Sequence, residues 1–173
     1  PIPVPSPLKR SASDMFHVLT QQEIGHFIKA AGPDGKGPQY YEMTEQDIAA
    51  IIAEFVEAAL RAKSAGFDGV ELHAGHGYLL ASFLSPYTNT REDNYGGSRE
   101  NRARFLTQMI SAIRQAAGAN FPILVRLDAM EYRTKGGITP DDCAVTAALC
   151  EQAGADAIDA VSYTHLTLPT KRI

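Results

Sequence analysis

Three short apolar segments alternate with helical segments along the chain, and this alternation constrains the fold more than any other feature. The apolar segments are residues 68–72, 122–127 and 157–161. Apolar residues recur at helical spacing from Ile48 to Leu60 ahead of the first segment, and helical stretches separate the other two. Strands that alternate with helices are typical of parallel βαβ crossovers. We therefore predict an α/β fold with a parallel sheet.

Start and stop signals define the expected helices. Thr44 with Asp47 three residues later has the form of a capping box, with aspartate in place of the usual glutamate. Ser98 and Thr139 have the character of N-cap residues, and a proline and two acids follow Thr139 in the expected first turn. Gly154 ends the last of these helices. The helices are expected at residues 44–66, 79–83, 98–116 and 139–153.

Both ends of the chain differ from the middle in composition and sequence pattern. Residues 1–43 hold six of the ten prolines and are expected to form a loop-rich lead-in. The chain begins without methionine, so we expect the natural N-terminus to lie upstream. Residues 163–173, YTHLTLPTKRI, continue neither a helical nor a strand pattern, and we interpret them as a non-native tail. Residues 1–162 are then one partial domain, with βα units at 44–162.

Charge, hydropathy and cysteine usage indicate the class of partner and the compartment. The 173 residues carry a net charge of -4 with a pI near 5.7 and show no basic stripe, which argues against nucleic-acid binding. The apolar runs are too short to span a bilayer, and no signal peptide opens the chain. Cys143 and Cys150 are two helical turns apart, roughly 10 Å, which is too far for a disulfide. We expect a soluble cytoplasmic protein with free thiols and no membrane partner.

Two histidines and a tyrosine follow the first expected strand in the sequence H-A-G-H-G-Y. They are His73, His76 and Tyr78, and Gly75 and Gly77 between them allow a sharp turn. Titratable side chains at the C-terminal end of a strand are where α/β barrels place their chemistry. Imidazoles can donate hydrogen bonds to a carbonyl or an oxyanion, and a neighbouring tyrosine can deliver a proton. The alternative is that His73 merely ends the strand and His76 is a solvated loop residue.

Arg126 is a charged residue in the middle of an otherwise apolar expected strand. A charge in that position needs a partner or a ligand, because burying it alone costs several kcal/mol. Glu71 lies two residues before His73, so strand alternation places both on one face. We expect Glu71 to pair with Arg126 across the sheet. Either a structural ion pair or a ligand-binding cation satisfies the sequence, and both roles can coexist.

The run that follows the histidines is specific enough to resemble a family. Residues 82–105 read SFLSPYTNTREDNYGGSRENRARF. Together with H-A-G-H-G-Y, this run resembles the Old Yellow Enzyme family, in the branch of 2,4-dienoyl-CoA reductase and bacterial NADH oxidases. The resemblance covers about residues 40–161. It implies a TIM (β/α)8 barrel, of which this chain would carry roughly strands 4 to 6 with their helices as an open fragment.

The resemblance also implies roles for the candidate residues. His73 and His76 would bind the activating carbonyl of a small-molecule substrate, and Tyr78 would donate a proton to it. Arg126 would approach the pyrimidine edge of FMN, where a cation favours the reduced flavin. The parent would be an enzyme that transfers hydride from NAD(P)H through FMN to an enone or dienoyl thioester, or an NADH oxidase. An iron–sulfur cluster, a second flavin and the oligomeric state stay open.

One departure from the family pattern and two alternative functions stand beside the flavin-enzyme interpretation. The chain departs from the family at Asp128, where serine is common after V-R-L. One alternative is a metal-dependent TIM-barrel hydrolase in which His73, His76 and Glu71 bind zinc. Another is that the 173-residue polypeptide by itself is truncated and inactive, because a three-stranded sheet exposes its edges. A set of charged residues is expected to anchor loops and helices without touching a ligand: Arg91, Asp93, Glu100, Arg102 and Arg104.

Overall fold

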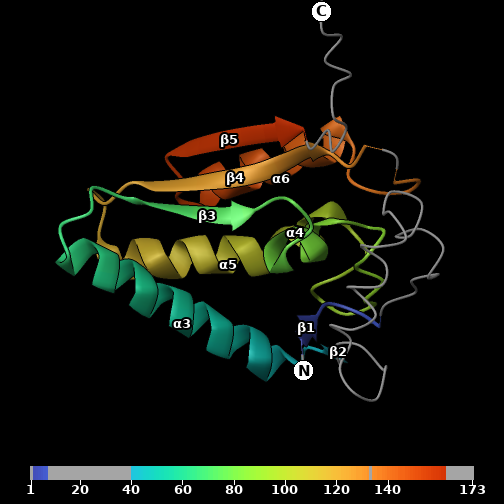
Figure 1. Cartoon of the computed structure of the whole chain (residues 1–173), viewed down its shortest axis with the longest axis horizontal. Helices are drawn as coiled ribbons and strands as arrows, with labels where there is room; N and C mark the ends of the chain where they lie inside the picture. The colour runs from blue at the N-terminus through green and yellow to red at the C-terminus, as the bar shows by residue number, and fades with distance from the viewer. Residues whose placement is uncertain (1, 8–39, 133, 163–173) are drawn as a thin grey trace, which may run out of the picture.

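The structure is a computed structural model that describes residues 2–7, 40–132 and 134–162 (Figure 1). Strands and helices alternate along most of this part of the chain. In chain order the elements are β1 Ile2–Val4, β2 Tyr40–Glu42, α3 Glu45–Ser64, β3 Val70–Ala74, α4 Leu79–Leu84, α5 Arg99–Ala117, β4 Ile123–Met130, α6 Pro140–Ala153 and β5 Ala157–Ser162.

The main sheet consists of three parallel strands in the order β3-β4-β5. All three run in one direction, toward the end of the molecule that holds α4 and the long loop after it (Figure 1). The helices α5 and α6 provide the crossovers between successive strands. The predicted α/β fold with a parallel sheet is confirmed. The described strands do not close into a barrel.

The strand β3 begins and ends two residues later than the expected segment at 68–72. Gly69 lies so close to the next strand that a Cβ on it would come 2.7 Å from the carbonyl oxygen of Pro122. Regular pairing starts one residue on, where the Val70 amide donates to that same oxygen at 3.0 Å. His73 is therefore a residue of the strand itself and pairs in register with Arg126. The placement of His73 in a turn after the strand was wrong.

The helix boundaries follow the capping residues closely. Thr44 and Asp47 form the complete capping box of α3, and Thr139 and Asp142 form that of α6. The Ser98 side chain accepts a hydrogen bond at the start of α5. Gly154 ends α6 in the left-handed conformation, with φ of 107°. Local side-chain chemistry therefore determines where the predicted helices start and stop.

The two faces of the sheet differ in polarity. One face packs against the helices through Leu72 and Ala74 of β3 and Val125 of β4, which are buried with residues of α5 such as Phe105 and Ile110. This face and the helices form the hydrophobic core. The opposite face carries a row of ionisable groups from all three strands: Glu71, His73, Arg126 and Asp159. The alternation along each strand thus separates a face that packs against the helices from a face that carries ionisable side chains.

The described parts of the lead-in contain a feature that the sequence did not reveal. The strands β1 and β2 pair in parallel, with Ile2 opposite Tyr40. The Arg91 guanidinium fastens this pair to the loop after α4, because its Nη1 donates to the carbonyls of Pro5 and Met43 at 2.8 Å each. The rest of the lead-in and the expected non-native tail lie outside the described residues.

Neither cysteine forms a disulfide, as predicted. Cys150 is buried and Cys143 is half-buried, both on α6. Burial, and to a lesser degree the neighbouring Cys143, raises the pKa of the Cys150 thiol to about 12. Within the described part of the chain, no helix has both the length and the apolar character needed to cross a membrane.

Candidate functional site

The candidate site lies where β3 runs into α4, at the C-terminal edge of the sheet. His73 is half-buried within β3, His76 is half-buried in the turn, and Tyr78 is the N-cap of α4 with 63% of its surface exposed. The ring centroids of His73 and His76 are 4.9 Å apart, and those of His73 and Tyr78 are 5.2 Å apart. Both pairs meet edge to face. The structure therefore brings the three predicted side chains together, with His76 and Tyr78 both in contact with His73.

The backbone of the turn has an unusual conformation at the second histidine. His76 has a φ of 61°, the left-handed region, which is uncommon for a residue other than glycine, although histidine adopts it more readily than most. Gly77 also has a positive φ, 69°, so a side chain there would be strained. At Gly75 the constraint is space, not the backbone dihedral angle. A Cβ on Gly75 would come 3.1 Å from Oδ1 of Asp128.

Asp128 is the residue that holds this turn. It lies on β4, with 4% of its surface exposed. Its carboxylate accepts the backbone N–H of His76 through both oxygens, at 3.0 Å to Oδ1 and 2.8 Å to Oδ2. A carboxylate bound to a backbone amide makes a stronger bond than a neutral acceptor does. Sequence reasoning noted Asp128 only as a departure from the family pattern, and it gave no signal of this contact.

Arg126 lies in the row of charges beneath the turn. Its Nε is 3.3 Å from Oε1 of Glu71 on β3, which confirms the expected pair. Asp159 on β5 is a second partner, 2.7 Å from Nε and 2.6 Å from Nη2. The hydrogen bond and charge of Asp159, and then the charge of Glu71, raise the pKa of Arg126. Sequence reasoning missed Asp159, although the alternation of β5 would have placed it on this face.

The polar atoms left without partners at this face suit a polar ligand. Glu71 and Asp159 occupy Nε and Nη2 of Arg126, and in the described part of the chain Nη1 has no partner. Nδ1 of His73 is the one buried side-chain nitrogen or oxygen there without a hydrogen bond. Buried polar atoms normally have a hydrogen-bond partner, so a buried nitrogen without one indicates that a ligand could provide it. A planar, acceptor-rich cofactor such as FMN fits this set of groups.

A second carboxylate fastens the loop after β4 to the loop after α4. Glu131 accepts the hydroxyl of the buried Ser85 at 2.6 Å and the amide of Ile138 at 2.7 Å. Gly137 packs directly against the Glu131 side chain and leaves no room for a Cβ. The two loops that border the histidine turn are therefore tied to each other as well as to β4.

The charged residues expected to be anchors have that role where the structure gives them partners. Arg102 donates to the carbonyls of Leu84 and Gly97 and to Asp142 at the start of α6. Arg104 donates to the carbonyl of Asn94 at 2.7 Å. These contacts join the long loop, α5 and α6 into one support beside the site.

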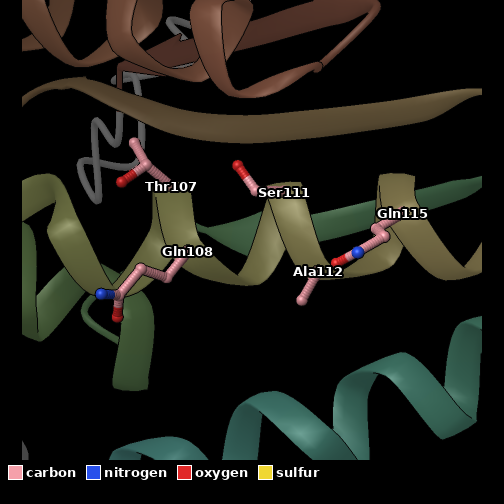
Figure 2. A pocket seen from close by; sticks show the side chains of 5 residues that line it. All are labelled: Thr107, Gln108, Ser111, Ala112 and Gln115. Carbon is pink, nitrogen blue, oxygen red and sulfur yellow. The ribbon is translucent and has the colours of Figure 1, made fainter.

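Across the described ranges, no cluster of three or more histidine, cysteine, aspartate or glutamate residues could hold a metal ion. Glu71, which the hydrolase alternative needs beside the histidines, contacts Arg126. An open hollow on α5 (Figure 2) is lined by side chains that carry no charge: Thr107, Gln108, Ser111, Ala112 and Gln115.

Comparison with known proteins assigns the chain to a family. The model of the NADH:flavin oxidoreductase / NADH oxidase family matches residues 6–173. An NADH oxidase from Thermoanaerobacter brockii is 43% identical over 134 residues, which are 78% of this chain and 20% of that protein. An NADPH dehydrogenase from Clostridium acetobutylicum is 50% identical over 101 residues, 58% of this chain and 30% of that protein.

Solved structures give the same result. A 2-naphthoyl-CoA reductase in complex with 2-naphthoyl-CoA superposes with a TM-score of 0.67 at 36% identity, over 77% of this chain and 20% of that one. Old Yellow Enzyme from a Pichia species superposes with a TM-score of 0.57 at 35% identity, over 73% of this chain and 29% of that one.

These matches define a class of flavin-dependent oxidoreductases. The chain belongs to the NADH:flavin oxidoreductase / NADH oxidase family. It spans 20% of the length of the NADH oxidase and 30% of that of the NADPH dehydrogenase. Membership supports FMN as the cofactor and NAD(P)H as the electron donor, as the sequence resemblance implied.

Proposed function

We propose that the protein containing this chain is an FMN-dependent oxidoreductase that passes hydride from NAD(P)H to an activated C=C bond of a small molecule. The observation that carries the proposal is the cluster of His73, His76 and Tyr78, which lies at a strand end beside Arg126. Family membership supplies the flavin chemistry, and the cluster supplies groups suited to a carbonyl. NADH oxidase activity is the second candidate, because a relative with 43% identity carries that name.

Each side chain has a definite task in this proposal. The imidazoles of His73 and His76 donate hydrogen bonds to the carbonyl oxygen of the substrate and so draw electron density from the conjugated double bond. Tyr78 holds the proton that the α-carbon takes up, and its exposure leaves it open to a substrate. An enone or an unsaturated thioester has the required carbonyl. The name of one neighbour, 2-naphthoyl-CoA reductase, supports the thioester.

Arg126 is the proposed contact to the cofactor. Bound FMN would supply the hydride chemistry that no side chain of this set can provide. Nη1 of Arg126 would donate to an acceptor on the pyrimidine edge, while Glu71 and Asp159 hold the guanidinium in place. The negative charge that a reduced flavin carries there would be stabilised by the cation.

The fold proposal places this chain within a larger barrel. We assign β3, β4 and β5 to strands 4 to 6 of a TIM (β/α)8 barrel, with the row from Glu71 to Asp159 facing the barrel interior. Residues 1–162 would form this partial barrel, with the βα units at 44–162, and residues 163–173 would be foreign to it. The family match runs to residue 173 and does not separate these last residues.

Substitution of the histidines in the full-length protein tests the proposed function. A phenol can bind in place of the substrate, with its oxygen where the carbonyl oxygen would lie. His73→Ala and His76→Ala should each weaken the binding of a p-substituted phenol and slow enone reduction, while flavin content stays near that of the wild type. Losing a hydrogen bond to a bound oxyanion corresponds to about tenfold or more in affinity. Wild-type phenol affinity in both variants would refute the carbonyl-binding role.

A further inference from the structure

The strand β4 contacts the histidine turn through the side chain of Asp128, and this contact goes beyond the three proposed catalytic groups. We propose that Asp128 is a positioning residue that sets the orientation of His76 by holding its backbone. The inference rests on the proposed function, because it concerns how the carbonyl-binding histidines are arranged.

The geometry of the contact is specific to the second histidine. Both carboxylate oxygens of Asp128 lie within 3.0 Å of a single donor, the backbone N–H of His76. That residue has a φ of 61°, a conformation that L-residues adopt only where the surroundings favour it. The direction in which the imidazole leaves the backbone depends on this dihedral angle. A residue that holds the amide therefore controls where the ring lies relative to His73, 4.9 Å away.

The surroundings of Asp128 leave its carboxylate little freedom to move. It is 4% exposed, and the enclosed gap beside it is lined by side chains of β4, α4 and α6, among them Leu84, Leu127 and Cys143. Gly75 closes the space on the turn side, since a Cβ there would come 3.1 Å from Oδ1. A buried carboxylate needs hydrogen-bond donors, and the amide of His76 is the donor that the turn presents.

Among the described residues, no arginine or lysine forms an ion pair with Asp128. Its negative charge, after burial itself, contributes to raising the pKa of the Cys143 thiol. Asp142 lines the same enclosed gap, but its carboxylate is bound by Arg99 and Arg102. The carboxylate of Asp128 is thus directed at the backbone of the turn, and no ion pair replaces that contact in the described part of the chain.

The test uses the full-length protein, loaded with FMN, and three variants. Asp128→Ala removes both acceptor oxygens. Asp128→Asn keeps one acceptor of the same shape. Asp142→Asn is the matched control, because it alters another buried carboxylate in the same region that binds Arg99 and Arg102.

The first readout requires no turnover. In protein labelled with ¹⁵N only at histidine, the His76 amide should resonate downfield and exchange slowly with solvent in the wild type. Asp128→Ala should shift this signal upfield and accelerate its exchange, Asp128→Asn should lie between, and Asp142→Asn should leave it unchanged. A purely structural role for Asp128 would lower stability without this selective effect on one amide.

The second readout is the affinity for a p-substituted phenol at unchanged flavin content. We expect about a tenfold loss in Asp128→Ala, a smaller loss in Asp128→Asn and none in Asp142→Asn, the range that one charge-assisted hydrogen bond can produce. Unchanged phenol affinity in Asp128→Ala and Asp128→Asn, together with weakened binding in His76→Ala, would overturn the positioning role alone. Unchanged affinity in both His73→Ala and His76→Ala would instead refute the proposed function.

If Asp128→Ala fails to fold, Asp128→Asn decides the matter, since it preserves volume and burial. An Asp128→Asn protein with wild-type stability, a shifted His76 amide and weakened phenol binding supports the proposal. The same protein with a wild-type amide signal and wild-type binding overturns it.

Discussion

Arg126 and His73 are register partners on adjacent parallel strands, so the candidate flavin contact and the candidate substrate contact lie side by side on one face of the sheet. Strand pairing fixes their spacing, because neighbouring strands lie about 4.8 Å apart. Glu71 and Asp159 then hold the arginine from either side. His73 and Arg126 are thus held on strands, whereas His76 lies in the turn and Tyr78 at the N-cap of α4.

Removing the arginine charge should change the properties of the flavin. In the full-length protein, Arg126→Met leaves the carboxylates of Glu71 and Asp159 facing one another without the cation between them. We expect the FMN reduction potential to fall by roughly 30 mV or more, which corresponds to about 1.4 kcal/mol for a two-electron couple, or FMN occupancy to fall. A redox titration measures the first effect and the flavin-to-protein ratio the second.

Arg126→Lys is the control for that change, because it keeps a positive charge but loses the planar set of donors. The FMN reduction potential should fall less in Arg126→Lys than in Arg126→Met. An unchanged potential with full occupancy in Arg126→Met would leave the residue with a structural role only.

Tyr78 should affect turnover more than binding. Tyr78→Phe removes the hydroxyl while keeping the ring that contacts His73. We expect the rate of enone reduction to fall by about 100-fold or more, the usual contribution of a positioned acid, with little change in phenol affinity. Tyr95→Phe is the matched control, because its hydroxyl donates to Gln108 on α5. Equal activities of the two variants would rule out Tyr78 as the proton donor.

The sequence predicted the framework of this site well, because its signals are local. Capping residues such as Thr44 and Thr139 specify helix starts through contacts three residues away. The pairing of Glu71 with Arg126 followed from strand alternation and one unpaired charge. Contacts between distant segments could not be predicted where no strand alternation or unpaired charge indicated them. The bond from Asp128 to the amide of His76 spans 52 residues, and nothing in either segment encodes it. The parallel pair β1 and β2 was missed for the same reason.

The stability of the α5–α6 junction should depend on pH through Asp142. Burial by itself raises the pKa of this carboxyl, but hydrogen bonds from Thr139 and Arg99 outweigh burial and lower the pKa to about 2. The folded-state pKa lies below the ordinary value of 3.8, so the stabilisation is present above pH 4 and disappears as the pH falls toward 2. At pH 7, Asp142→Asn should cost about 2 kcal/mol of unfolding free energy.

Urea unfolding of the full-length protein at several pH values measures this effect. The difference between the wild type and Asp142→Asn should shrink as the pH is lowered from 4 to 2. Asp141→Asn, its exposed neighbour in the same helical turn, is the control and should cost less than about 1 kcal/mol at any of these pH values. A pH-independent difference for Asp142→Asn would contradict the assigned ion pairs.

The two cysteines should differ in reactivity. Burial raises the pKa of the Cys150 thiol to about 12, so very little of it is ionised at pH 8, and the side chain is buried. Cys143 has a raised pKa as well but is half-buried. We expect iodoacetamide to modify Cys143 before Cys150 in the native protein and both equally in urea, as measured by peptide mass spectrometry. Rapid labelling of native Cys150 would show that α6 does not pack as described.

The last prediction concerns the 173-residue chain expressed without further sequence. In the described part of the chain, β3 and β5 each pair on one side only, with β4. Parallel strands are stable when both neighbours and both faces are covered, whereas here the row of Glu71, Arg126 and Asp159 has no covering layer among the described elements. We expect this polypeptide to aggregate or remain partly unfolded, to be inactive and to be colourless after purification. The full-length protein should be yellow, with a flavin band at about 450 nm. Size-exclusion chromatography with absorbance detection compares the two, and a soluble, yellow, monomeric 173-residue chain would show that three strands suffice to hold FMN.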